Sequence, residues 1–159
     1  MKSDDIKIDF DNSIGPWLGK TSKIVDCYLH EAMKARDLDL SKEQMIVLKK
    51  LCDKDGLNQN ELAFLTLRDK SSLTRLLSKM EKKEYIFRKQ STEDKRNNHV
   101  FITLKGRDIF SKTRPVIKEI MEQMERDITK KEILQMINTL QKIQFNFTGK
   151  YTTSLTHNV

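Results

Sequence analysis

The sequence has very little cysteine, with only Cys27 and Cys52 among its 159 residues. Two thiols cannot form a metal site by themselves, and they do not suggest the disulfide scaffold of a small secreted domain. The three histidines are scattered, and no set of carboxylates or thiols accompanies them at metal-ligand spacing. We therefore expect no metal and no cofactor, and buried thiols as the default for both cysteines.

Long apolar runs are also missing. No apolar stretch approaches about 18 residues, the length needed to span a membrane, and no stretch has the pattern of a secretory signal. We therefore expect a cytoplasmic protein without a membrane partner. An enzyme reading would use Cys27 and His30, three residues apart on a helix, as nucleophile and base, but no oxyanion site accompanies them. The sequence favours a binding protein over an enzyme.

Positive charge is concentrated in one part of the chain. The formal net charge is +7, and residues 66–96 alone hold ten basic against five acidic residues. A local cationic excess of this kind is typical of a nucleic-acid-binding surface. The two ends differ from it, and we expect residues 1–12, which are acidic, and residues 149–159, which are polar, to be flexible.

Two capped helices follow each other in the basic region. Asn58 and Glu61 have the spacing of a capping box and predict a short helix over residues 59–65. Asp69 repeats the N-cap chemistry before a longer helix over residues 70–83. This second helix has an apolar stripe at positions i, i+3, i+4 and i+7, formed by Leu73, Leu76, Leu77 and Met80. The order is typical of a helix-turn-helix whose second helix packs its stripe on the core.

The opposite face of the second helix is polar and basic. A helix turns by about 100° per residue. Eight residues therefore fall on this face, on its flanks or at its start: Lys70, Ser71, Ser72, Thr74, Arg75, Ser78, Lys79 and Lys82. Arginine can form two hydrogen bonds to a guanine edge, hydroxyl groups reach bases or phosphates, and lysines suit phosphates. Such a face taken alone is more often ordinary solvated surface. Its place after a capped turn in a basic region favours a DNA recognition helix.

A β-hairpin is predicted after the second helix. Residues 85–90 and 99–104 are rich in aromatic and β-branched residues, and eight polar residues separate them. The tip contains Asp94, Lys95 and Arg96. An arginine on a narrow ribbon suits the minor groove of DNA, and the aspartate could brace its guanidinium group. The alternative is a charged loop without a partner.

Apolar residues at helical spacing extend over both ends of the chain, and Pro115 is expected to bend the long helix after the hairpin. A single winged helix could not cover so many apolar stripes. We therefore expect residues 13–36 and 107–148 to form a helical dimerisation region, and residues 37–106 to form the DNA-binding region. The alternative is a monomer with one large helical core.

The segment from Gly56 to Gly106 resembles the MarR family of bacterial winged-helix transcription regulators. The resemblance rests on residues 56–63, 69–76 and 80–83, and on Asp94-Lys95-Arg96 followed by residues 102–106. It implies a mainly α fold with a small β-hairpin, in which a winged helix-turn-helix core is joined to N- and C-terminal dimerisation helices. Two positions depart from the family pattern. Glu84 stands where the family usually has a glycine that ends the recognition helix, and Asn97-Asn98 stand where it often has charged wing residues.

The resemblance also implies a function. Thr74, Arg75 and their neighbours would lie in the major groove, and Arg96 would enter the minor groove. The protein would be a homodimer that binds double-stranded DNA at a pseudo-palindromic operator, because two recognition helices about one DNA turn apart add their binding energies. By resemblance it would more often be a repressor than an activator.

In that family, small and often aromatic or anionic effectors bind between the dimerisation helices and the winged domain. Trp17, Tyr28, Met33 and Phe110 could line such a crevice here, although each of these residue types is more often plain core. Two alternatives stay open: an architectural or weakly specific DNA-binding protein, and a thiol-based redox sensor acting through Cys27. The peroxide-sensing branch of the family has its reactive cysteine near the start of the first helix, where this chain has Trp17.

Overall fold

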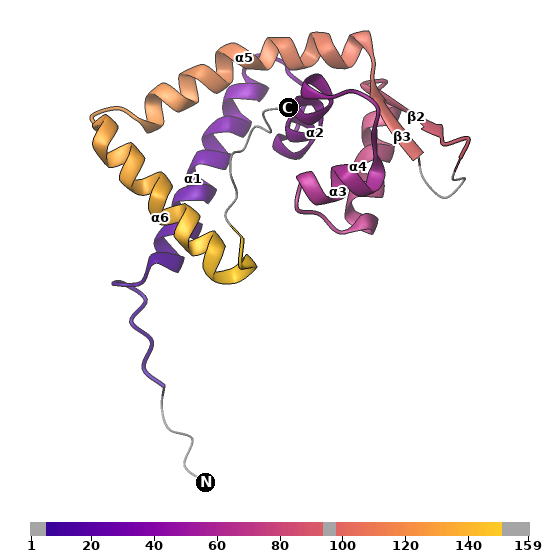
Figure 1. The fold of residues 1–159 in the computed structure, drawn as a ribbon. Coiled ribbons are helices and arrows are strands. Elements are labelled where there is room, and N and C mark those ends of the chain that lie inside the picture. The colour runs from indigo at the N-terminus through magenta and orange to yellow at the C-terminus, as the bar shows by residue number, and fades with distance from the viewer. Residues whose placement is uncertain (1–5, 94–97, 151–159) are drawn as a thin grey trace. The chain divides into compact units, whose positions relative to one another are not determined.

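The computed structural model describes residues 6–93 and 98–150, which form six helices and one three-stranded antiparallel sheet (Figure 1). In chain order these elements are α1 (Ile14–Lys34), α2 (Lys42–Asp53), β1 (Leu57–Asn58), α3 (Gln59–Leu65), α4 (Lys70–Lys82), β2 (Ile86–Gln90), β3 (Asn98–Ile102), α5 (Leu104–Met124) and α6 (Lys130–Thr148). The chain divides into two compact units, residues 1–120 and 121–159. The predicted mainly α class with a small hairpin is confirmed.

Hydrogen bonds at the helix starts explain where α2, α3 and α4 begin. The Ser41 hydroxyl accepts from the backbone N–H of Gln44 at 3.2 Å, and the Gln44 side-chain oxygen accepts from the Ser41 N–H. Asn58 and Glu61 form the same reciprocal pair at α3, and the Asp69 carboxylate accepts from the first turn of α4 at 2.8 Å. These bonds satisfy N–H groups that a helix leaves unpaired. The predicted bounds of α3 and α4 are confirmed to within one residue.

The sheet has the strand order β1-β3-β2. Strands β2 and β3 form the predicted hairpin, in which Phe87 lies opposite Phe101 and the two rings stack with centroids 5.2 Å apart. Strand β1 is not predicted from the sequence, because two residues are too few to show alternation. It pairs Leu57 with Val100 of β3. The hairpin is therefore bonded to the segment that begins the helix-turn-helix.

Two clusters of buried side chains hold the first unit together. The larger one, which we term the winged-helix core, joins α2, α3, α4 and the sheet and includes Val47, Leu48, Leu51, Leu62, Leu73, Leu77, Met80, Ile86 and Val100. The predicted apolar stripe of α4 belongs to it. The smaller one, the α1–α5 cluster, contains Leu29, Met33 and Val116. Each large apolar side chain buried in this way contributes about 1.5–3 kcal/mol.

The turn that ends α4 contains a non-glycine residue in the left-handed region. Glu84 has a φ of +62°, which costs a residue with a side chain about 1 kcal/mol relative to glycine. The Tyr85 N–H donates back to the Met80 carbonyl at 3.0 Å, as in a Schellman motif. The Thr103 hydroxyl donates to the Glu84 carbonyl at 2.6 Å, and Lys105 pairs with the Glu84 carboxylate at 2.9 Å. Contacts with the start of α5 therefore hold the turn where the family pattern has glycine.

The helices at the two ends leave large apolar side chains uncovered in the single chain. In α1 these exposed residues are Ile14, Trp17, Leu18, Ile24 and Tyr28. In α6, all of whose residues the structure describes, none is buried, and the exposed apolar residues are Leu134, Met136, Ile137, Phe145 and Phe147. Apolar surface exposed on this scale marks an interaction surface.

Candidate nucleic-acid interface

The structure places the predicted recognition residues on the solvent side of α4. This helix packs against α3 and β2, beside the hairpin (Figure 1). Six of its eight candidate residues are exposed: Lys70, Ser71, Thr74, Arg75, Lys79 and Lys82. The other two, Ser72 and Ser78, are half-buried. Because the apolar stripe is buried, the polar and basic side of α4 faces solvent.

Two hydroxyl groups on this surface are held by contacts within the chain. Arg68 donates from Nη1 to the Ser72 hydroxyl at 2.8 Å. The Thr74 hydroxyl donates to the Lys70 carbonyl oxygen at 2.8 Å, and the Gln59 amide donates to the Thr74 hydroxyl at 3.5 Å. These contacts restrict both side chains in the unbound chain, which lowers the entropy cost of ordering them against a partner.

Glu81 and Arg88 join α4 to β2. Arg88 donates from Nε and Nη2 to one oxygen of the Glu81 carboxylate, at 3.2 and 2.7 Å, and from its backbone N–H to the other at 3.0 Å. The side-chain hydrogen bonds from Arg88 lower the pKa of Glu81, which stays ionised. Arg88 also donates to the Ser78 hydroxyl at 3.2 Å. The sequence does not predict this contact between Glu81 and Arg88, because no local spacing signals a contact between a helix end and the following strand.

Three cationic side chains of α4 are exposed to solvent. Arg75, Lys79 and Lys82 lie at positions i, i+4 and i+7, on one side of the helix. Within residues 6–93 and 98–150, no group forms a hydrogen bond or a close ion pair with any of the three. Their charge is therefore available for phosphates or base edges.

Asp69 restricts phosphate binding at the start of α4. Its carboxylate accepts from the Ser72 N–H at 2.8 Å, and this hydrogen bond lowers the pKa of Asp69. An ionised carboxylate occupies the N–H group that would otherwise face an anion, and it repels a phosphate nearby. The start of α4 is therefore a poor anion site, and its exposed basic side chains are better suited to bind phosphate.

The wing-tip candidates Asp94, Lys95 and Arg96 lie outside the described residues. Strand β2 ends at Gln90 and β3 begins at Asn98, so the hairpin that leads to them is confirmed. The role expected for Arg96 in the minor groove stays a prediction.

The four effector candidates lie in different environments. Met33 is buried in the α1–α5 cluster, and Phe110 is buried in the winged-helix core. Trp17 and Tyr28 are exposed on α1, about 16 Å apart along the helix by a rise of 1.5 Å per residue. The Trp17 indole N–H donates to the Asp11 carbonyl at 2.7 Å. An effector site formed by these residues stays a prediction.

The two cysteines differ in environment. Cys52 packs half-buried against the winged-helix core, and burial raises the pKa of its thiol, which disfavours the reactive thiolate. Cys27 is exposed, contrary to the default of a buried thiol, because its part of α1 is uncovered in the single chain.

In the part of the chain that the structure describes, no group of three or more His, Cys, Asp or Glu residues could hold a metal ion, and no helix has the length and apolarity to cross a bilayer.

Known proteins resemble this chain in sequence and in fold. The model of the MarR family matches residues 40–97. The HTH-type transcriptional regulator SarZ of Staphylococcus saprophyticus is 30% identical over 116 residues, 73% of this chain and 75% of that protein. The MarR protein of Peptoclostridium difficile has a TM-score of 0.77 at 25% identity, covering 89% of this chain and 92% of that one. BpsR of Bordetella bronchiseptica, whose DNA binding is regulated by 6-hydroxynicotinic acid, has a TM-score of 0.78 at 17% identity, covering 87% and 97%. These solved structures confirm the predicted winged-helix fold.

Proposed function

The chain belongs to the MarR family of DNA-binding transcription regulators, and we propose that it is a sequence-specific homodimeric repressor that acts on a pseudo-palindromic operator. Its relatives are transcription regulators, and it is a regulator rather than an enzyme. The sequence preference, the dimer and the repressor role are the parts that we propose.

The observation that carries the proposal is the exposed cationic side of α4 above a buried apolar stripe. A helix with its side chains is about 10–12 Å across and fits the major groove of DNA, which is about 12 Å wide. Arg75, near the middle of the helix, would read a guanine edge, and the preorganised Thr74 would reach a neighbouring base. Lys79 and Lys82 would contact phosphates. By family resemblance, Arg96 would add a minor-groove contact.

The dimer is supported by the uncovered apolar residues of α1 and α6. A second copy of the chain offers the same residues, and most soluble oligomers are symmetric homo-oligomers, with two-fold dimers the commonest. Two copies of α4 about one DNA turn apart would read the two halves of a pseudo-palindrome.

The oligomeric state is tested by light scattering at micromolar concentration. The chain has a mass of 18.7 kDa, so the dimer is expected at twice that value, about 37 kDa. A particle of 18.7 kDa under these conditions would contradict the dimer and, with it, the pseudo-palindromic operator.

The proposal includes a small aromatic or anionic effector. BpsR, which shares the fold, responds to an aromatic acid. On α1 the Lys20 ammonium lies 5.8 Å from the centroid of the exposed Trp17 ring. An aromatic ring and a cation side by side suit a planar acid, which would stack on the indole and pair its carboxylate with the lysine. Tyr28 and Met33 lie about 16 and 24 Å from Trp17 along α1, too far for one small effector to contact all three. Phe110 is buried in the winged-helix core and is not part of this surface.

A further inference from the structure

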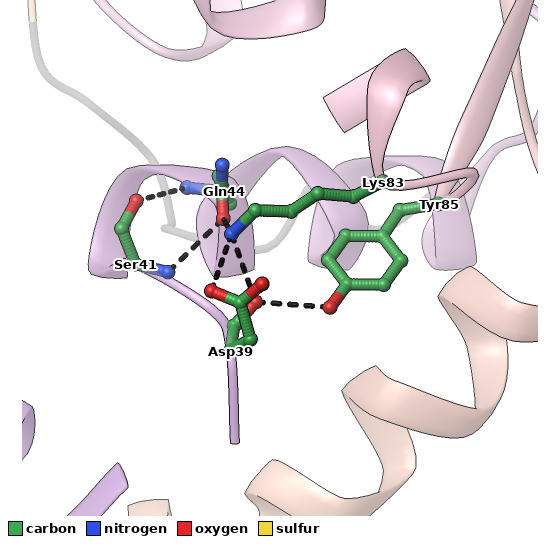
Figure 2. A network of polar contacts seen from close by, with 5 residues as sticks. All are labelled: Asp39, Ser41, Gln44, Lys83 and Tyr85. Atoms are coloured by element: carbon green, nitrogen blue, oxygen red, sulfur yellow. Dashed lines mark hydrogen bonds and ion pairs between the residues drawn. The ribbon is translucent and has the colours of Figure 1, made fainter. Parts of the chain in front are cut away.

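A polar cluster at the C-terminal end of α4 has no part in the proposed DNA contacts. It consists of Asp39 in the α1–α2 linker, Gln44 in α2, and Lys83 and Tyr85 just after α4 (Figure 2), and we term it the Lys83 junction. The Lys83 ammonium donates to the Asp39 carboxylate at 2.7 Å, to the Asp39 carbonyl at 3.1 Å and to Gln44 Oε1 at 3.3 Å. The Tyr85 hydroxyl donates to the same Asp39 carbonyl at 2.9 Å.

The Lys83 junction is held in one arrangement by its buried members. Gln44 and Tyr85 are buried, whereas the Lys83 side chain is 29% exposed and the Asp39 side chain is 76% exposed. The Gln44 oxygen that contacts Lys83 also accepts from the Ser41 N–H at 3.2 Å, in the capping box of α2. Figure 2 shows the ammonium directed at both the amide and the linker. The end of α4 is thus bonded to the start of α2 and to the segment before it.

The linker that the ammonium group contacts is itself fixed on both sides. Leu38 packs against the α1–α5 cluster, and Leu40 is buried in the winged-helix core. Just before them, Arg36 pairs with Glu119 of α5 at 2.6 Å. Asp39 lies between the two leucines, so its contacts connect the end of α4 to the segment that joins α1 to the DNA-binding region.

We propose that the Lys83 junction positions α4 relative to α1 and thereby sets the spacing between the two half-sites that the dimer binds. This proposal rests on the proposed homodimer and its two-part operator. Because α1 carries part of the proposed dimer surface, the orientation of α4 relative to α1 determines the distance between the two recognition helices. Lys83, Asp39 and Tyr85 are positioning residues that act on DNA binding only through α4.

The geometry of α4 makes its C-terminal end an effective place for such control. The helix has 13 residues and is therefore about 20 Å long at 1.5 Å per residue. A rotation of roughly 5° about its C-terminal end would move its N-terminal end by about 1.7 Å. This displacement exceeds the tolerance of about 0.5 Å within which binding groups have to be held.

Lys83→Met removes the ammonium group and retains most of the apolar stem. The exposed Asp39 carboxylate is left in contact with water, Gln44 keeps its bond to Ser41, and Tyr85 keeps its bond to Asp39. No buried polar group loses its last partner, so the variant is expected to fold.

The test measures how operator spacing affects affinity. Wild-type protein selects an operator from a random duplex pool, and variants of that operator have the half-site centres moved by one or two base pairs. Each added base pair shifts the half-sites by about 3.4 Å and rotates them by roughly 35°. We expect wild type to bind every altered spacing at least about tenfold more weakly than the selected one. Lys83→Met is expected to bind the one-base-pair variants within about threefold of its best site, or to prefer another spacing.

Two variants serve as controls. Lys83→Arg keeps a cation within reach of Asp39 and is expected to restore the wild-type spacing profile. Lys112→Met removes the same charge from an exposed pair with Asp108 inside α5 and is expected to leave the profile unchanged.

The outcomes separate this proposal from the proposed function. If Lys83→Met keeps the wild-type spacing profile, or if it loses affinity equally at all spacings together with thermal stability, the positioning role is overturned while the operator stands. If wild type selects no two-part site, the proposed function itself fails, and this inference falls with it.

Discussion

Replacing Arg75 with alanine is expected to weaken operator binding by about 1 to 3 kcal/mol for each half-site, a loss of roughly 5- to 150-fold per half-site that multiplies over the two half-sites. The guanidinium group is exposed on α4, and in the described part of the chain no group holds it by a hydrogen bond. It is therefore available for two hydrogen bonds to one guanine. Fluorescence anisotropy titrations with the selected operator and its point variants give the loss, and base preference is expected to relax at one position in each half-site.

Matched variants separate base reading from phosphate binding. Arg75→Lys keeps the charge but loses the two-bond geometry, so it should recover only part of the affinity and little of the base preference. Lys82→Ala should weaken all duplexes alike and reduce the salt dependence, by about one unit of slope for each phosphate that the protein no longer neutralises. If Arg75→Ala weakens the operator and a scrambled duplex equally, Arg75 contacts phosphate and the base-reading role is wrong.

Replacing Gly106 with alanine is expected to lower the free energy of unfolding by about 3 kcal/mol. A Cβ atom at this position would lie 2.1 Å from the Tyr85 carbonyl oxygen and 3.0 Å from Ile102 Cγ1. The nearest atom belongs to the backbone, and the same oxygen accepts from the Thr103 N–H at 3.0 Å. The start of α5 therefore cannot move away without breaking this hydrogen bond to Tyr85, which follows the turn at the end of α4. Chemical denaturation at a fixed protein concentration measures the loss, since the stability of a dimer depends on concentration.

Gly19→Ala is the matched control, because Gly19 also lies within a helix and, unlike Gly15, is not followed by a proline, which disfavours helical geometry in a residue with a Cβ atom. A Cβ atom there would meet nothing within 4 Å. Alanine is the better helix former, so this variant should be unchanged or more stable by up to about 1 kcal/mol. Equal unfolding free energies for Gly106→Ala and wild type would mean that the close packing of α5 on Tyr85 is not present in solution.

Local signals in the sequence predicted the helix-turn-helix closely. The Asn58 capping box and the Asp69 cap lie within three or four residues of the groups they satisfy, so the spacing alone places the starts of α3 and α4. The apolar stripe of α4 fixes which side is buried, and the exposed position of Arg75 follows from the same periodicity.

Contacts between distant residues could not be predicted in this way. Arg88 reaches back to α4 from the next strand, and Lys83 contacts Asp39 across 44 residues. Neither pair has a spacing that a helix or strand imposes, because the fold brings them together only after the core has packed. The exposure of Cys27 likewise depends on what covers α1, which the helical pattern of that segment does not specify.

The claim that this regulator reads a DNA sequence is tested most directly by its affinity for two duplexes at about 0.15 M salt. One is the selected operator, and the other is a scrambled duplex of the same length and composition. We predict that the scrambled duplex binds at least about a thousandfold more weakly, which is the discrimination typical of specific DNA-binding proteins. A ratio near one, with both affinities falling steeply as salt rises, would contradict it and identify an architectural protein that binds phosphates alone.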